Sequence, residues 1–275
     1  MSSLRIDPVE FRGLACLRLA AGGATALVSL RGAQVLSWIP ADGRERLFLA
    51  EAAGRVPGAA LRGGIPVIFP QFGGRGPLRK HGFARLLDWS FAGSDGASAQ
   101  LELRDGAATA EWPQAFACRL SVALSATRLE VSLDIANTGD TAFDATAALH
   151  TYLRVGDATG ATIEGLHGCD FEDSAAGGTL HRQHEALVGF DGETDRIYGD
   201  VVAPLALVDG DRRVAIEHDG FADVVVWNPG ERLAGGIADL ARGEWRTFVC
   251  VEAAQVLQPL RLAPGEHWRG SQRLG

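Results

Sequence analysis

Cysteine is scarce in this chain, and its four copies lie far apart. Cys16, Cys118, Cys169 and Cys250 form no CxxC pair in a sequence of 275 residues. A disulfide-stapled domain or a cysteine-based zinc site would place its cysteines at short, regular spacings. The pattern argues against a disulfide framework and predicts no metal site. We expect four free thiols that behave as small buried apolar side chains.

Long apolar runs are also missing. The longest apolar stretches, at 64–70 and 223–227, are far shorter than the roughly 20 residues of a membrane-spanning helix. The first eight residues, MSSLRIDP, lack the basic start and apolar run of a secretory signal. We therefore expect a cytoplasmic protein that has no membrane partner.

Positive charge is in the minority, with 26 Lys and Arg residues against 34 Asp and Glu, for a formal net charge of −8. Nucleic-acid binding relies on basic patches that neutralise phosphates, so this balance argues against a nucleic-acid partner. An anionic small molecule would need a local cluster of positive charge.

Several signatures of other chemistries are absent. Neither the GxSxG turn of serine hydrolases nor the GxxxxGK loop of nucleotide-binding proteins occurs. His181 and His184 offer two metal ligands, but no third ligand is spaced to complete a site. No sustained helical stripe appears, and residues 232–241 are predicted to form at most a short helix.

The chain instead contains many short apolar or alternating runs separated by Gly, Asn, Asp or Pro, which is typical of β-strands. Examples are residues 26–30, 119–124, 129–135, 214–217 and 247–252. In the run 129–135, Leu, Val, Leu and Ile fall on one face while Glu, Ser and Asp fall on the other, so we predict one buried and one wet face. Residues 136–140, ANTGD, then supply a turn to an antiparallel neighbour. With no linker or repeat, we predict one all-β domain over 1–275, built from two packed sheets.

Positive charge gathers in one glycine-rich segment. Arg62 stands beside a glycine pair, which we expect to allow close approach of the backbone to a ligand, and Lys80, His81 and Arg85 follow. Lys80 is the only lysine in the chain. These residues are either solvated cations of a long loop or, given the net charge of −8, the binding site for an anion.

Two further segments place ionisable groups in apolar sequence. His150 shares a strand face with Tyr152, and its imidazole can exchange a proton near neutral pH. Glu252 ends an apolar run, where an ionised carboxylate is costly unless it is paired or used. Each has a plainer explanation, as an ordinary core or surface histidine and as a glutamate at the exposed end of a strand.

With these residues in place, the chain resembles the aldose 1-epimerase superfamily and, within it, the glucose-6-phosphate 1-epimerases. Seven blocks carry the resemblance in order. They are LRGGIPVIFPQFG at 61–73, KHGFAR at 80–85, Trp89, LHTYLRV at 149–155, ETDRIY at 193–198, VVVWNP at 224–229 and FVCVEAA at 248–254. RGGIPVIFPQFG and HGFAR resemble the branch that acts on phosphorylated sugars, whereas the other branch acts on galactose.

The resemblance implies a galactose-mutarotase-like β-supersandwich and an isomerase that needs no cofactor. His150 and Glu252 match the catalytic acid and base of the family, and Asp195 matches the aspartate that orients the substrate. The family arginines that hold the phosphate correspond to Arg62 and Arg85. Lys80 replaces a Gln usual in similar sequences. We expect it and His81 to contact the substrate as well.

The implied reaction interconverts the α and β anomers of a hexose 6-phosphate, most simply glucose 6-phosphate, in a protein that we expect to be a monomer. Glu252 would take the proton of the C1 hydroxyl while His150 protonates the ring oxygen, which requires an ionised Glu252 and a protonated His150. Two alternatives stay open. One is a mutarotase for free aldoses, in which the cations are structural; the other is a carbohydrate-binding β-sandwich without catalytic activity.

Overall fold

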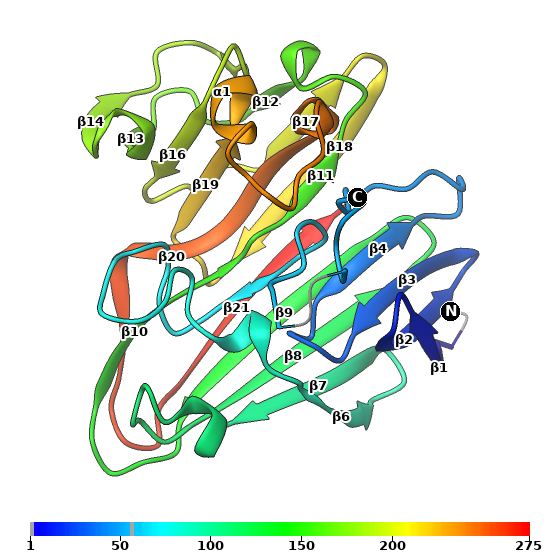
Figure 1. Ribbon diagram of the computed structural model, residues 1–275, viewed down its shortest axis with the longest axis vertical. Helices are drawn as coiled ribbons and strands as arrows, with labels where there is room; N and C mark the ends of the chain where they lie inside the picture. The colour runs from blue at the N-terminus through cyan, green and yellow to red at the C-terminus, as the bar shows by residue number, and fades with distance from the viewer. Residues whose placement is uncertain (1–2, 56–57) are drawn as a thin grey trace.

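The computed structural model describes residues 3–55 and 58–275, which form three antiparallel sheets (Figure 1). A four-stranded sheet contains β1 (Arg5–Phe11), β2 (Leu14–Ala21), β3 (Ala24–Ser29) and β4 (Val35–Ile39). A nine-stranded sheet has the order β15 (Leu187–Val188), β12 (Thr162–Glu164), β17 (Leu205–Asp209), β18 (Arg212–Asp219), β21 (His267–Leu274), β9 (Leu129–Asn137), β8 (Phe116–Leu124), β7 (Ser98–Arg104) and β6 (Ser90–Ser94). An eight-stranded sheet has the order β14 (Thr179–Arg182), β13 (Asp170–Asp173), β16 (Thr194–Tyr198), β19 (Asp223–Asn228), β20 (Phe248–Leu262), β10 (Phe143–Leu149) and β5 (Val67–Ile68), with β11 (Tyr152–Arg154) also paired to β20. The predicted all-β class is confirmed.

Helical structure is brief. The short helix predicted within 232–241 forms slightly earlier, as α1 (Gly230–Ala234). The 3-10 turns are η1 (Ala84–Leu86), η2 (Ala107–Thr109), η3 (Ala158–Gly160), η4 (Ser174–Ala176) and η5 (Glu244–Thr247). Within the described ranges, no helix has the length and apolar character needed to cross a membrane.

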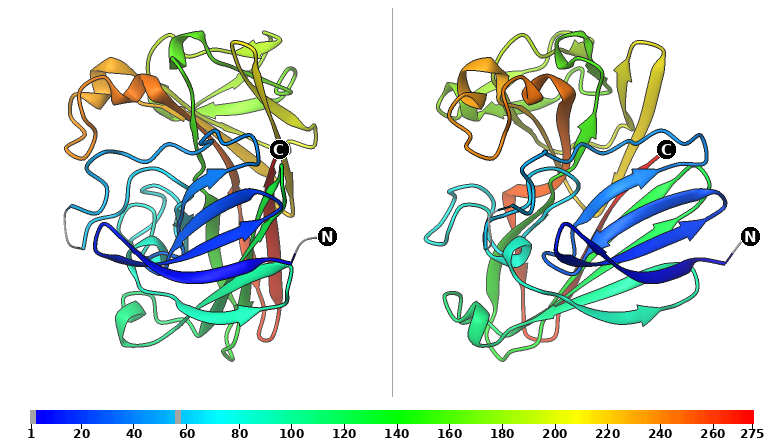
Figure 2. Two further views of the ribbon diagram at one scale, coloured as in Figure 1. Left: turned by 90° about the vertical axis from the view of Figure 1, so that its right-hand side faces the viewer. Right: turned by 45° about the vertical axis from the view of Figure 1, so that its right-hand side comes forward.

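One apolar core connects the three sheets. Leu19 of β2, Leu133 of β9 and Val251 of β20 are all buried in the same cluster. Figure 2 shows the four-stranded sheet, in blue, lying across the green strands of the nine-stranded sheet, and β2 and β3 both contact β8. The prediction of two packed sheets therefore missed one sheet, because the strand pattern of residues 5–39 does not say which strands pair. The assignment of 1–275 to one domain stays a prediction.

The alternation predicted for 129–135 is seen in β9, with one exception. Leu129, Val131, Leu133 and Ile135 are buried, and Glu130 and Asp134 are partly exposed on the other face. Ser132 is buried as well, because it lies between β8 and β21 in the middle of the sheet.

The turn after β9 joins two different sheets. β9 pairs with β8 and β21, whereas the next strand, β10, pairs with β20 and β5. The Asn137 side-chain amide donates hydrogen bonds to the carbonyl oxygens of Thr141 and Leu262, which holds the crossing in place. The prediction that this turn leads to an antiparallel neighbour was wrong. Turn residues mark where a chain changes direction, and tertiary packing decides which sheet it enters.

The first half of strand β20, residues 248–254, is buried on both faces, and this places the candidate site. Val249 and Val251 pack into the core that the sheets share. Side chains alternate along a strand, so Cys250 and Glu252 point to the opposite face. Both are also buried. A carboxylate on that second face is therefore enclosed by protein rather than exposed at the end of the strand.

Candidate active site

A cleft lies on the face of the eight-stranded sheet that points away from the shared core. The register places Tyr152 opposite Cys250, Cys250 opposite Trp227, and Trp227 opposite Asp195. Directly paired residues point to the same side of a sheet, so these side chains and that of Glu252 share one face. The cleft has a volume of about 470 Å³. Four strands from distant parts of the chain therefore build one hollow.

His150 lies at the interruption between β10 and β11. Its backbone N–H donates to the carbonyl oxygen of Pro66 at 3.0 Å instead of to β20. The imidazole stacks on the Tyr152 ring, with centroids 4.8 Å apart, and meets the Trp227 ring edge-on. This break in the ladder directs the imidazole into the cleft, where two aromatic rings restrict its motion.

His150 and Glu252 meet in the cleft although 102 positions separate them in the chain. His150 Nε2 lies 3.2 Å from Glu252 Oε1, and the two residues are only 8% and 1% exposed. His150 Nδ1 and Glu252 Oε2 have no hydrogen-bond partner within residues 3–55 and 58–275. Buried polar atoms nearly always have partners, so two unpartnered atoms in one contacting pair mark this part of the cleft as unusual.

Burial shifts the pKa values of this pair in opposite directions. It raises the pKa of Glu252 well above the usual 4.5, and the negative charge of Asp195 adds to the shift. It lowers the pKa of His150 well below 6.5, helped by His81 and by the arginines of the cleft. Burial therefore favours a neutral imidazole and a protonated carboxyl group, not the charged forms that the sequence-based mechanism requires. Both arrangements hold one proton, which can move across the 3.2 Å contact.

Arg62 is held at one wall of the cleft by two partners. Its Nε donates to Asp239 Oδ1 at 2.8 Å, and its Nη1 donates to the Tyr152 hydroxyl at 3.4 Å. The side chain is 22% exposed. Asp239 thus orients the guanidinium group while part of the fork stays open to the cleft.

The glycine pair after Arg62 has a different purpose from the predicted one. A Cβ on Gly63 would lie 2.3 Å from the carbonyl oxygen of Phe48, and one on Gly64 would lie 2.1 Å from that of Val35. Both residues also have positive φ angles, of 110° and 61°. The prediction of close approach to a ligand was wrong, because these glycines let the segment pack against the protein's own backbone. Neither glycine lines the cleft, whereas Arg62 beside them does.

Arg85 and His81 stand together in the cleft. Arg85 Nη2 donates to the Lys80 carbonyl oxygen at 2.8 Å, while its buried Nε has no partner in the described part of the chain. His81 Nδ1 accepts a hydrogen bond from the Gly73 N–H, so its proton is assigned to Nε2. Burial, followed by Arg85, Lys80 and Arg62, lowers the pKa of His81 to about 3. His81 is therefore a neutral hydrogen-bond donor beside a cation.

Asp195 supplies negative charge to the cleft. Burial raises its pKa from 3.8 to about 6, with Glu193 and Asp173 adding to the shift and Lys80 opposing it. Lys80 is exposed at the rim and lines the same cleft. The chain's only lysine is therefore close enough to stabilise the ionised form of Asp195.

All of the residues selected from the sequence line this one cleft, namely Arg62, Lys80, His81, Arg85, His150, Asp195 and Glu252. Sequence reasoning gave no role to Tyr152, Trp227 or Phe72, although all three lie within the quoted blocks. Asp239 had no signal, because an acidic residue in a loop is ordinary. His181 and His184 are exposed and do not line the cleft.

Comparison with known proteins points to one family. A family model described as aldose 1-epimerase matches residues 15–275. A Cenchrus ciliaris protein named "Putative glucose-6-phosphate 1-epimerase" is 35% identical over 260 residues, covering 89% of this chain and 79% of that protein. A protein of the same name from Escherichia coli K12 is 34% identical over 241 residues, covering 83% and 79%.

Solved structures agree with the predicted fold. The crystal structure of a "putative mutarotase (YeaD)" from Salmonella typhimurium matches with a TM-score of 0.88 and 29% identity, over 98% of this chain and 92% of that one. A galactose mutarotase-like protein from Lactobacillus casei matches with a TM-score of 0.73 at 16% identity, over 98% and 99% of the two chains. The galactose-mutarotase-like supersandwich is thereby confirmed. Because the family model spans nearly the whole chain, the protein belongs to the aldose 1-epimerase family.

Proposed function

We propose that this protein is a hexose-6-phosphate mutarotase, which interconverts the α and β anomers of a sugar such as glucose 6-phosphate. The observation that carries the proposal is a buried His150–Glu252 pair in the same cleft as two arginines. Each member of the pair has one atom with no hydrogen-bond partner among the described residues. The pair offers acid/base chemistry, and Arg62 and Arg85 offer charge for a phosphate. The names of the relatives from Cenchrus ciliaris and Escherichia coli agree with it.

Ring opening requires one proton to leave the C1 hydroxyl and one to reach the ring oxygen. Sugar hydroxyls replace the apolar surroundings of the pair with hydrogen bonds, which favours transfer of the shared proton from Glu252 to His150. Glu252 then accepts the C1 hydroxyl proton while His150 protonates the ring oxygen, and the C1–O5 bond breaks to give the open aldehyde. Rotation about C1–C2 and reversal of the same transfers give the other anomer. Each proton goes to a named atom, so the mechanism needs no cofactor.

The remaining cleft residues bind and orient the sugar. Arg62 and Arg85 pair with the phosphate, which does not change during the reaction, so they act mainly through binding. Asp195 in its ionised form accepts hydrogen bonds from sugar hydroxyls, and His81 donates one from Nε2. Lys80 reaches over the rim to a hydroxyl or to the phosphate.

The anomer exchange rate tests this proposal directly. Saturation-transfer NMR would compare glucose, mannose and galactose 6-phosphates with the corresponding free sugars, with and without the protein. We expect faster exchange for a phosphorylated sugar and a weaker effect on free sugars. An equal or greater effect on free sugars would identify a general aldose mutarotase. Binding without faster exchange would identify a carbohydrate-binding protein.

A further inference from the structure

One cluster in the cleft has the composition of a metal site that the cysteine spacing did not predict. One ring nitrogen of His150, Cys250 Sγ and one carboxylate oxygen of Glu252 all lie within 4.8 Å of one another, and all three residues are buried. Cys250 and Glu252 are two positions apart on β20 and share a face. The expectation of no metal site rested on distances along the chain, and the fold brings together residues that the sequence separates.

The ligand atoms are available. Cys250 is a free thiol. His150 Nδ1 and Glu252 Oε2 are enclosed by protein and have no hydrogen-bond partner among the residues described. Neither side chain is therefore fully occupied by contacts with the rest of the protein.

Sulfur, imidazole nitrogen and carboxylate oxygen together suit a borderline-soft divalent cation such as Zn²⁺, whereas Mg²⁺ and Ca²⁺ prefer oxygen ligands alone. Three protein ligands with a fourth position open to the cleft form the usual arrangement of an accessible zinc site. Ligand atoms around one Zn²⁺ are roughly 3.3–3.8 Å apart, so the observed cluster needs to contract by only about 1 Å.

We propose that His150, Cys250 and Glu252 bind Zn²⁺ in competition with the sugar. On binding, the thiol proton and the proton shared by the pair leave to solvent, and the thiolate and carboxylate balance the charge of the ion. The occupied site removes the acid and the base from the reaction, so Zn²⁺ is an inhibitor. The metal site does not depend on the proposed function. Only the inhibition of anomer exchange by Zn²⁺ rests on that function.

Cys250 gives the proposal a clean test, because its thiol lies beneath the surface of the cleft, outside its lining. Cys118, another buried free thiol on β8 in the shared core, provides the matched control. Chelator-treated protein would be titrated with Co²⁺, whose thiolate charge-transfer band reports a sulfur ligand. We expect the band in the native protein and in Cys118→Ala, and its loss in Cys250→Ala and in Cys250→Ser.

Zinc titration of the anomer exchange rate is the second measurement. Cys250→Ala should keep the exchange rate and need more Zn²⁺ for half inhibition, on the order of tenfold or more, than Cys118→Ala. Mg²⁺ should have no effect on either protein. An unchanged cobalt band in Cys250→Ala, or equal zinc sensitivity of both variants, would overturn the proposal. A cobalt band in a protein without exchange activity would support the metal site while refuting the proposed function.

Discussion

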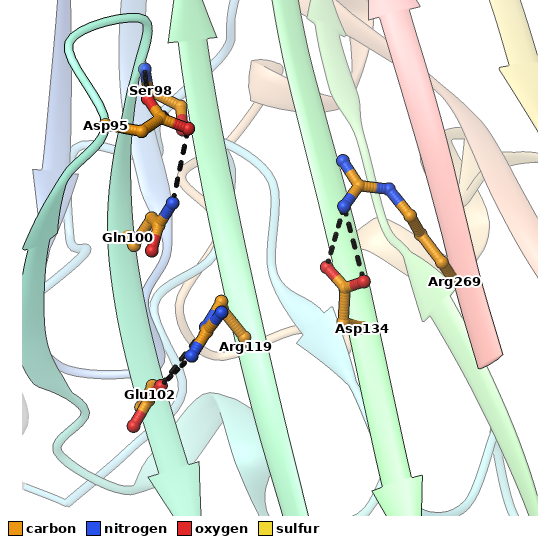
Figure 3. A network of polar contacts seen from close by, with 7 residues as sticks. All are labelled: Asp95, Ser98, Gln100, Glu102, Arg119, Asp134 and Arg269. Atoms are coloured by element: carbon orange, nitrogen blue, oxygen red, sulfur yellow. Dashed lines mark hydrogen bonds and ion pairs between the residues drawn. The ribbon is translucent and has the colours of Figure 1, made fainter. Parts of the chain in front are cut away.

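Two hollows of similar size on this molecule differ in whether their charged and polar side chains have partners. On the outer face of the nine-stranded sheet, a hollow of about 520 Å³ is lined by acidic and basic residues of β7, β8, β9 and β21. Figure 3 shows that these charges are paired across strands, with Arg269 on Asp134 at 3.3 Å and Arg119 on Glu102 at 2.6 Å. In the cleft of about 470 Å³, atoms of His150, Glu252 and Arg85 have no partners within the described ranges.

The two hollows differ in whether the polar groups of their linings are satisfied, and the hollow that we propose as the site is the one with atoms unpartnered among the described residues. Paired surface charges already interact with an opposite charge, so contact with a ligand adds little binding free energy. An unpartnered buried group costs free energy in the empty protein, and that cost is recovered when a ligand supplies the missing partner. For this reason we propose the smaller hollow as the active site.

Removing the acid or the base should have the largest effect. Glu252→Gln or His150→Ala should lower the anomer exchange rate by about 10² to 10⁴, since general acid/base catalysis contributes factors of this size. Polarimetry or saturation-transfer NMR would measure the rate. Arg269→Ala on the outer sheet face is the matched control and should keep the native rate. If Glu252→Gln kept most of its activity, the cleft pair would not supply the acid and base, and the proposed difference between the two hollows would be wrong.

Loss of an arginine from the cleft should weaken binding more than turnover. Arg62→Ala or Arg85→Ala should raise KM for glucose 6-phosphate by about tenfold to a hundredfold, the value of one or two charged hydrogen bonds, with a smaller change in kcat. Arg119→Ala removes an equal charge from the paired face and should leave KM unchanged. If the double variant Arg62→Ala/Arg85→Ala preserved the preference for phosphorylated over free glucose, the phosphate assignment would be wrong.

The pH dependence of binding should report Asp195, whose pKa is raised to about 6. The carboxylate accepts hydrogen bonds from sugar hydroxyls more strongly when it is ionised, so KM should rise as pH falls below about 6, by up to tenfold per pH unit. Steady-state rates from pH 5 to pH 8 would show this limb. Asp195→Asn should have a higher KM that no longer varies over this range. The same limb in Asp195→Asn would assign the titration to another group.

The free energy of unfolding should show the smallest effects. At pH 7 it should rise on substitution of Glu252 in the cleft and fall on substitution of Asp134 on the outer sheet face. Burial raises the folded pKa of Glu252, so its stabilising contribution is full below pH 4.5 and is lost as pH rises through that raised value. Glu252→Gln should therefore be more stable than the native protein at pH 7, with the advantage vanishing near pH 4. Asp134→Asn breaks a surface pair and should lose less than about 1 kcal/mol. Urea unfolding with chelator present would measure both variants, and a Glu252→Gln protein less stable at pH 7 would contradict the burial argument.

The sequence predicted the strands better than their partners. Leu129 to Ile135 alternate because one face of a strand must be buried, and this constraint is local. The turn at Asn137 was recognised, but its crossing between sheets was not, because pairing is decided by contacts with residues more than a hundred positions away. The small sheet of residues 5–39 was missed although each of its strands pairs with a neighbour in sequence.

The candidate site divides in a similar way. Residue types and their order in the motif blocks were enough to select His150, Glu252 and the cleft cations, and the convergence of these residues is a property of the fold. Asp239 and Cys250 were passed over, because their roles depend on neighbours that only folding supplies. Asp239 lies 177 positions from the arginine it holds.

By itself, the sequence determined the strand-rich class and the side chains available for proton transfer and anion binding. Both depend only on the type of each residue and its near neighbours in the chain. Only the tertiary structure decided that His150 and Glu252 lie 3.2 Å apart and that Cys250 lies beside them. Burial and proximity produce these properties, and both arise when distant strands meet in one sheet.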